Sequence, residues 1–156
     1  MGPLPIAALR APDHGKLIPF RFVVIHHDGL SRLAELFIDY GRRHGKSGEE
    51  LERERERAVQ APLVIAIVAR VDPSAEMPTH EQWIAVGGAV ANLLNALHFL
   101  GFGAKALSGL RASDPEISKA FCQESEQLVG WVSVGTPKSR SAPRGADPID
   151  GIYSEF

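Results

Sequence analysis

The sequence predicts a protein of the α+β class, in which helices and strands follow one another without a regular repeat. Short apolar runs of the strand type occur at residues 20–26, 63–71, 104–108 and 128–135. Longer segments with helical periodicity separate these runs, and two helices follow one another between the first and the second strand. The order α, β, α, α, β, α, β, α, β lacks the strict alternation of a parallel β–α–β fold.

The N-terminal part of the chain predicts a helix end, a loop, a strand and a second helix. The helix of residues 5–10 stops before Pro12, because the residue that precedes a proline disfavours the helical region. The loop of residues 11–19 leads into FRFVVIH at residues 20–26, whose aromatic and β-branched content is typical of a strand. Residues 30–43 carry apolar side chains at helical spacing.

A strongly charged helix is expected next. Ser47 and Glu50 form a capping-box pattern, in which each side chain satisfies the backbone amide of the other. The sequence EELERERER then pairs glutamates with arginines at i,i+3 spacing, as Glu50–Arg53, Glu52–Arg55 and Glu54–Arg57. This pattern predicts a solvated surface helix, in preference to a charged patch that binds a partner.

The second half of the chain predicts three strands and a long apolar helix. Residues 63–71 form a nearly continuous apolar run, typical of a strand that is covered on both faces. Residues 81–100 predict the long helix, and Gly101 ends it because glycine readily adopts the left-handed conformation. A strand, a short helix and a last strand are expected at residues 104–108, 115–122 and 128–135.

The long helix contains a stretch of small residues that bears on oligomeric state. Gly87, Gly88, Ala89 and Ala91 make this part of the helix thin enough for the backbone of a second helix to approach closely. The residues alone leave two interpretations open, a dimer built on this helix or a helix buried within one chain.

Length and composition describe an ordinary globular chain. Its 156 residues fit one domain, residues 1–156, with a polar C-terminal arm at residues 138–156. The net charge of −2 gives no reason to expect nucleic acid or an anionic membrane as a partner. The single cysteine excludes an intrachain disulfide and suits a reducing compartment. The apolar stretch 83–102 contains two asparagines and a histidine, so it predicts a buried helix, and we expect a cytoplasmic protein.

Few motifs point to chemistry. The six histidines show no metal-ligand spacing, so no metal site is predicted. The loop that feeds the first strand carries Arg10, Asp13, His14 and Lys16. Such a loop can direct cations at a planar anionic ligand, although a polar surface loop explains the same composition.

The same loop resembles a segment of the small NAD(P)H nitroreductases. The residues that carry the resemblance are Arg10-Ala11-Pro12-Asp13-His14, followed by Arg57-Ala58 with Ala61-Pro62, Glu81-Gln82 with Gly87, Gly101-Phe102-Gly103, Ser108-Gly109, and Val134 to Pro137. These segments occur in the same order over most of the chain, from Arg10 to Pro137. The chain is therefore similar to that family as a whole.

The resemblance implies a nitroreductase-like α+β fold, with a central, mostly antiparallel sheet flanked by helices, in a domain-exchanged homodimer that holds FMN at the interface. Arg10 and His14 of one subunit, and Ala106, Leu107 and Ser108 of the other, are expected to contact the FMN. The segment assigned to NAD(P)H contact comprises Ala96, Leu97, His98, Phe99, Leu100 and Gly101. No side chain is expected to act as a catalytic acid or base.

The expected reaction is electron transfer from NAD(P)H through FMN to a nitroaromatic, a quinone or a similar acceptor. The alternative is a non-enzymatic dimeric protein of the same fold that binds flavin weakly or not at all. Relatives carry an upstream Arg-Arg-Ser motif for the flavin phosphate, whereas residues 1–9 contain no basic side chain and no hydroxyl. The resemblance thus implies an N-terminally truncated member that holds FMN weakly.

Overall fold

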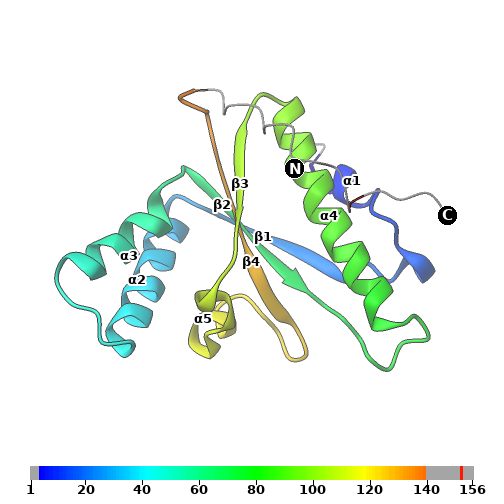
Figure 1. Ribbon diagram of the computed structural model, residues 1–156, viewed down its shortest axis with the longest axis horizontal. Coiled ribbons are helices and arrows are strands. Elements are labelled where there is room, and N and C mark those ends of the chain that lie inside the picture. The colour runs from blue at the N-terminus through cyan, green and yellow to red at the C-terminus, as the bar shows by residue number, and fades with distance from the viewer. Residues whose placement is uncertain (1–3, 140–151, 153–156) are drawn as a thin grey trace.

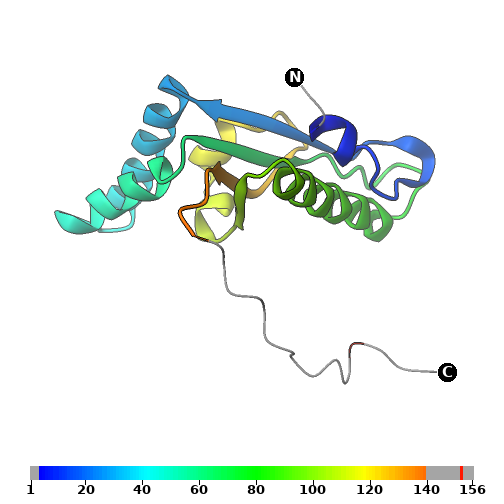
Figure 2. The same cartoon turned by 90° about the horizontal axis from the view of Figure 1, so that it is seen from above.

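A four-stranded antiparallel sheet forms the centre of the computed structural model, which describes residues 4–139 and residue 152. The strand order is β1-β2-β4-β3, and helices cover both faces of the sheet (Figures 1 and 2). The elements are α1 (Leu4–Ala8), η1 (His14–Lys16), β1 (Phe20–His26), α2 (Asp28–Arg43), α3 (Glu49–Val59), β2 (Leu63–Ala69), α4 (Thr79–Phe99), β3 (Gly103–Leu107), η2 (Leu110–Ser113), α5 (Pro115–Lys119) and β4 (Gln127–Gly135). The predicted fold class is therefore confirmed.

Strand β2 is central and covered on both faces, as its apolar run predicts. It pairs with β1 from Leu63, opposite His26, to Ala69, opposite Phe20, and on its other side with β4. Because side chains alternate across a strand, Val64 and its i+2 neighbours enter one core while Ile65 and Ile67 enter the other.

The two cores belong to different helices. On one face, α2, α3 and α5 pack on the sheet around a cluster that includes Phe37, Ile117 and Trp131. On the other face, Leu93 and Leu97 of α4 pack against the sheet, and α1 lies alongside α4 (Figure 1). The sheet therefore separates an α2–α3 side from an α4 side.

Helix α3 differs from the sequence prediction at its start and on one of its faces. Its N-cap is Gly48, no side chain caps it, and the expected capping box of Ser47 with Glu50 does not form. The expected i,i+3 pairs of Arg55 and Arg57 are present, with Glu52 and Glu54. However, Glu54 is 0% exposed, so the helix is not solvated on all sides. The prediction was wrong there because the burial of Glu54 comes from distant residues.

Part of the small-residue stretch of α4 is used within this chain. A Cβ at Gly88 would lie 3.0 Å from Cδ of Pro12, and Ala89 is fully buried, so the loop after α1 occupies this part of the helix. Gly87 and Ala91 remain exposed. The dimer stays a prediction, and of the predicted C-terminal arm, residues 138–156, only residues 138, 139 and 152 are among the described residues. Among the described residues, no helix combines the length and apolarity needed to cross a membrane.

At Gly130, β4 lies against the backbone at the end of β3. The register of β2 with β4 shifts between Ile67 and Val68, next to this glycine. A Cβ at Gly130 would lie 2.3 Å from the carbonyl oxygen of Leu107. Only a residue without a side chain fits at this position unless β3 moves.

We therefore expect Gly130→Ala to lower the free energy of unfolding by roughly 1–3 kcal/mol, the usual cost of forcing extra atoms into a packed site. Chemical denaturation measures this change. Leu110→Ala, at a side chain that is 79% exposed, is the control and should stay within about 0.5 kcal/mol of the wild type. Equal stability of the two variants would show that β3 and β4 are not packed as described.

Candidate functional site

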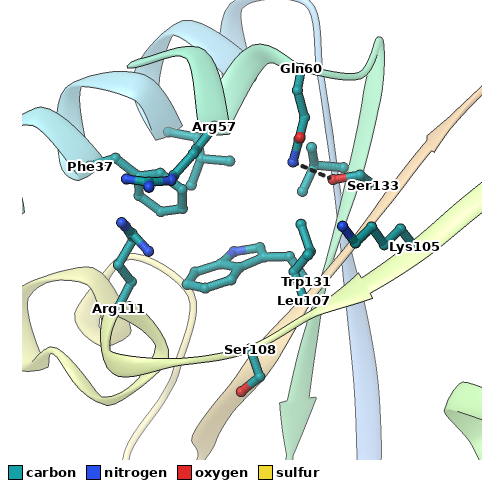
Figure 3. Close-up of a pocket in the computed structure, with 11 residues that line it drawn as sticks. Phe37, Arg57, Gln60, Lys105, Leu107, Ser108, Arg111, Trp131 and Ser133 are labelled. Atoms are coloured by element: carbon teal, nitrogen blue, oxygen red, sulfur yellow. Dashed lines mark hydrogen bonds between the residues drawn. The ribbon is translucent and has the colours of Figure 1, made fainter. Parts of the chain in front are cut away.

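A cavity of about 270 Å³ opens on the α2–α3 side of the sheet, between these helices and the edge formed by β3 and β4 (Figure 3). It is lined by Leu33, Phe37, Arg57, Gln60, Val64, Lys105, Leu107, Ser108, Arg111, Trp131 and Ser133. These residues come from α2, α3, β2, β3, η2, β4 and the adjoining loops. The cavity is therefore assembled from segments that are distant in the sequence.

Trp131 forms the floor of the cavity and carries a donor without an acceptor. Its ring meets Phe37 of α2 edge to face, with ring centroids 5.3 Å apart. Although Trp131 is 95% buried, its Nε1 has no hydrogen-bond partner within the described part of the chain. In Figure 3 this nitrogen lies on the edge of the indole that is turned toward Arg57 and Lys105, although the atom itself has almost no exposed surface. An unsatisfied buried donor costs roughly 1–3 kcal/mol, so a small shift of the lining that brings a ligand acceptor to Nε1 would be favourable.

The polar lining of the cavity is positively charged. Three of the lining side chains are cations, Arg57 from α3, Lys105 from β3 and Arg111 from η2, and none is an acid. The strand alternation that places Lys105 and Leu107 on this face places Ala106 on the other. The walls therefore favour a ligand that is anionic or rich in hydrogen-bond acceptors.

A second hollow, of about 400 Å³, adjoins the cavity. The two share Gln60, Lys105 and Ser133, and Gln60 Nε2 lies 3.4 Å from Ser133 Oγ at this junction. The second hollow is also lined by Thr136 and Lys138. An elongated ligand can thus extend past Lys105 toward a further cation.

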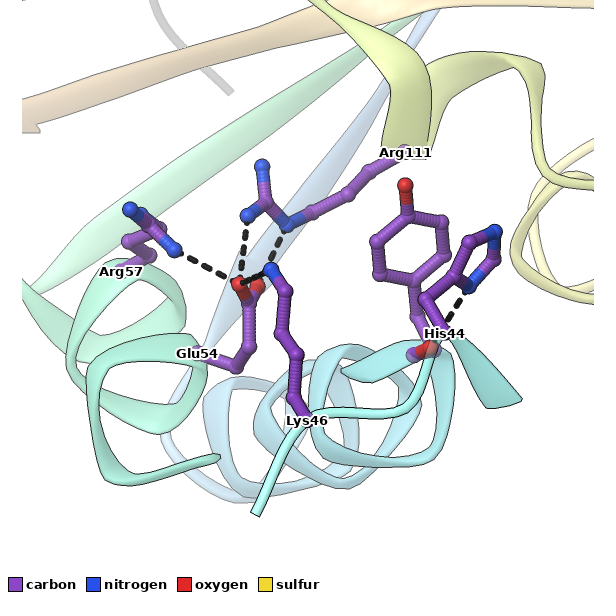
Figure 4. A network of polar contacts seen from close by, with 6 residues as sticks. His44, Lys46, Glu54, Arg57 and Arg111 are labelled. Atoms are coloured by element: carbon purple, nitrogen blue, oxygen red, sulfur yellow. Dashed lines mark hydrogen bonds and ion pairs between the residues drawn. The ribbon is translucent and has the colours of Figure 1, made fainter. Parts of the chain in front are cut away.

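Behind the cavity wall, the buried carboxylate of Glu54 binds three cations (Figure 4). It accepts hydrogen bonds from Lys46 Nζ at 2.6 Å, from Arg57 Nη1 at 2.6 Å, and from Arg111 Nε and Nη2 at 2.6 and 2.7 Å. Burial raises the pKa of Glu54, but the hydrogen bonds from Arg111 and Lys46 outweigh burial and lower it to about 2. The carboxylate is therefore charged at neutral pH.

Of the three residues in and directly after β3 that the sequence predicts as FMN contacts, two line the cavity and one does not. The side chain of Leu107 forms part of the wall, whereas Ala106 lies on the opposite face of the sheet. The hydroxyl of Ser108 points away from the cavity and donates to the carbonyl of Val129 at 2.8 Å (Figure 3). Any contact from Ser108 to a ligand must therefore come from its backbone or require this bond to break.

Arg10 and His14 lie far from this cavity in the same chain. Both are exposed on the α4 side of the sheet, and His14 Nδ1 is 2.8 Å from Glu81 Oε2 in the first turn of α4. The structure of one chain therefore does not bring them together with Leu107 and Ser108. The sequence prediction assigned the two groups to different subunits, and this arrangement stays a prediction.

The segment predicted to contact NAD(P)H, residues 96–101, lies at the end of α4 on the other side of the sheet. Leu97 is part of the core there. Its neighbours His98, Phe99, Leu100 and Gly101 are exposed, and Ala96 is half-buried. His98 and Gly101 line a separate hollow on that side.

The site residues predicted from the sequence did not include Arg57, Lys105, Arg111 or Trp131. The signal for Lys105 was present, because a lysine in an otherwise apolar strand marks the face that is open to solvent or ligand. The signal for Trp131 was ambiguous, since an inward-facing tryptophan is most often a packing residue. Nothing local distinguishes Arg57 from the other arginines of α3.

The chain matches the sequence profile of the Nitroreductase family over residues 6–136. The Escherichia coli (strain K12) protein named "Putative NAD(P)H nitroreductase YdjA" is 31% identical over 137 residues, which cover 87% of this chain and 75% of that protein. A Haemophilus influenzae protein named "Putative NAD(P)H nitroreductase" is 35% identical over 132 residues, which cover 83% of this chain and 72% of that protein.

Solved structures share the fold at lower sequence identity. A nitroreductase-like family protein from Bacillus cereus superposes with a TM-score of 0.81 at 18% identity, covering 98% of this chain and 81% of the other. A protein from Desulfovibrio desulfuricans, described as a putative nitroreductase in complex with FMN, superposes with a TM-score of 0.70 at 21% identity, covering 98% and 81%. At these identities the likeness establishes the fold.

The buried carboxylates predict how stability depends on pH. The pKa of Glu126 falls to about 2 because Arg21 hydrogen-bonds it, and that of Glu54 is also about 2, against 4.5 without such partners. Since the unfolded chain binds these protons more readily, the stabilisation is complete above about pH 4.5 and is lost as the pH falls toward 2. Urea denaturation at a series of pH values should show this loss.

Glu126→Gln removes one of the two groups, so the stability of this variant should be lower at pH 7 and should fall less steeply with acid. Parallel curves of stability against pH for the variant and the wild type would contradict the lowered pKa of Glu126.

Proposed function

Because the chain belongs to the nitroreductase family, we propose that it is an FMN-dependent oxidoreductase that binds the flavin in the cavity above Trp131. Electrons would pass from NAD(P)H to a nitroaromatic, a quinone or a similar acceptor. The single observation that supports this most strongly is the unpartnered indole donor in a cavity whose only charged side chains are cations. A structural neighbour that contains FMN adds support.

The residues of the cavity fit the flavin ring system. An isoalloxazine ring is planar and carries carbonyl oxygens and ring nitrogens that accept hydrogen bonds, which suits Trp131 Nε1 and the guanidinium of Arg57. The cavity of about 270 Å³ is slightly below the roughly 300–1,000 Å³ of small-molecule pockets, so it holds the ring and not the whole cofactor. The adjoining hollow, with Lys105 and Lys138, is then available to the phosphate-bearing chain.

When bound, FMN supplies the capacity to accept and release electron pairs, and the side chains of this chain bind, orient and shield it. Leu33, Phe37, Val64 and Leu107 provide apolar walls that keep water from one side of the cavity. Arg57, Lys105 and Arg111 place positive charge around it, which favours negative charge on the ligand. No acidic or imidazole side chain lines the cavity, so proton transfer by the protein is not part of the proposal.

A second copy of the chain would complete this site. One chain leaves Arg10 and His14 on the α4 side of the sheet, while the cavity opens on the other. The exposed part of α4 and the residues after it carry a group of large apolar side chains, Trp83, Ile84, Phe99, Leu100 and Phe102, with Phe99 87% exposed. Such a surface is typical of a subunit interface. The shared site that we propose requires in addition that the partner's Arg10 segment reaches the α2–α3 side, where the cavity opens.

The proposed function predicts saturable binding of FMN to the purified chain, seen as quenching of flavin fluorescence, and bleaching of the flavin absorbance by NADH or NADPH under anaerobic conditions. Trp131→Phe keeps the packing against Phe37 but removes the donor, so it should weaken FMN binding by about 5- to 30-fold, equivalent to roughly 1–2 kcal/mol. Leu110→Ala serves as the control and should bind FMN like the wild type.

Absence of flavin binding would leave a non-enzymatic protein of this fold as the remaining interpretation. Flavin binding with equal affinity in Trp131→Phe would move the flavin out of this cavity.

A separate prediction concerns the oligomeric state, which we expect to be a dimer. Light scattering should give twice the 16.9 kDa mass of one chain, and Arg10→Ala should weaken FMN binding while Lys16→Ala does not. Mixing Arg10→Ala with Trp131→Phe protein tests the arrangement, because mixed dimers contain one site with both substitutions and one intact site. Tight binding should therefore return for about a quarter of all sites after subunit exchange. A monomer with high flavin affinity would contradict a site shared between subunits.

A further inference from the structure

Glu54 binds two groups of cations that differ in their relation to the cavity. Arg57 and Arg111 both hydrogen-bond its carboxylate and both line the cavity. Lys46 binds the same carboxylate at 2.6 Å but does not line the cavity. Glu54 itself is fully buried and lines no part of the cavity, so it reaches a ligand only through the two arginines (Figure 4).

The contact with Arg111 fixes the plane of its guanidinium group. Two of its nitrogens, Nε and Nη2, donate to the two oxygens of Glu54, which is the two-point geometry that holds a guanidinium in one orientation. Its Cζ also lies 5.5 Å from the ring centroids of both Phe37 and Tyr40. The side chain is thereby held at both its edge and its face, and it is only 22% exposed.

Arg57 is held differently. Only its Nη1 donates to Glu54, and the side chain is 51% exposed at the wall of the cavity. Without the carboxylate, a long and half-exposed arginine would sample many rotamers, and ordering it on binding would cost entropy. The carboxylate therefore orders Arg57 before a ligand arrives.

We propose that Glu54 is a positioning residue for the flavin of this cavity, acting by holding Arg57 and Arg111 in the orientation that the isoalloxazine ring requires. This inference rests on the proposed function. The competing explanation is structural, since one carboxylate that joins α3, η2 and the segment after α2 would also stabilise the fold. A charge effect is a third explanation, because removing the carboxylate makes the surroundings more positive.

Riboflavin and FMN, titrated into Glu54→Gln and Lys46→Met proteins, separate these explanations. Riboflavin is uncharged, so loss of the negative charge on Glu54 by itself leaves its affinity nearly unchanged and strengthens that of FMN. Positioning predicts the opposite direction, with both flavins bound about 10- to 100-fold more weakly by Glu54→Gln, as expected when a charge-assisted hydrogen bond to the ligand is lost. Lys46→Met, which removes a partner of the same carboxylate outside the cavity, should bind both flavins within about threefold of the wild type.

Thermal unfolding of both variants measures the structural contribution separately from affinity. Glu54→Gln should also lose much of its flavin effect in an Arg57→Met background, because residues that act through one another are not additive. If Glu54→Gln does not fold, Glu54→Asp is used, since its shorter side chain keeps the charge but cannot reach all three cations. Glu54→Asp should likewise bind both flavins more weakly than the wild type.

Unchanged riboflavin affinity in the folded Glu54 variant, or an equal loss in Lys46→Met, would overturn the positioning role and leave the proposed function intact. No binding of either flavin by the wild-type protein would overturn the proposed function, and the inference with it.

Discussion

A buried carboxylate has to be compensated by cations, and this requirement at Glu54 organises the side of the molecule that holds the cavity. The cost of removing a charge from water is offset only when its oxygens are hydrogen-bonded, which Lys46, Arg57 and Arg111 accomplish together. These three cations come from the segment after α2, from α3 and from η2. One side chain thus fixes the relative position of three segments, and two of the cations that it needs become the wall of the cavity.

The second constraint is the alternation of side chains in the sheet. Along β4, Trp131 and Ser133 face the cavity while Val132 and Val134 face α4. A shift of one residue would exchange these two sets, removing the cavity floor and placing an indole under α4. Gly130, which lets β3 approach β4 at Leu107, contributes to holding this register. The chemistry of the cavity therefore depends on pairing between strands that are more than twenty residues apart.

Local sequence patterns were sufficient to predict most of the helices and strands. The strand at residues 20–26 was predicted with the bounds that the structure shows, because its aromatic and β-branched content and its flanking proline are local signals. The strand predicted at residues 63–71 ends at Ala69, since the chain leaves the sheet where its pairing with β1 ends. Helix α4 was found with both ends within two residues. Strand β1 and helix α4 are thus defined mainly by residues within themselves, whereas the end of β2 depends on its pairing with β1.

The site could not be predicted in the same way, and Glu54 shows why. Three glutamate–arginine pairs with i,i+3 spacing follow one another in α3, and nothing in the local sequence distinguishes one pair from the others. What separates Glu54 from Glu52 is Arg111, which lies 57 positions away in the sequence and meets α3 only in the folded chain. The same holds for Trp131, whose donor is notable because no acceptor approaches it, a property of the whole packed structure.

The ion pairs of Glu54 with Arg57 and Arg111 also explain how a cavity with such a positive wall can suit an uncharged ring. Glu54 cancels part of the charge of Arg57 and Arg111, so these side chains act first as oriented donors and only secondarily as a source of positive potential. Lys105 has no such partner among the described residues and lies where the cavity meets the second hollow. Positive potential should therefore be strongest at that junction and weaker over Trp131. The proposed placement of FMN, with its neutral ring over the indole and its anionic tail beyond Lys105, matches this distribution.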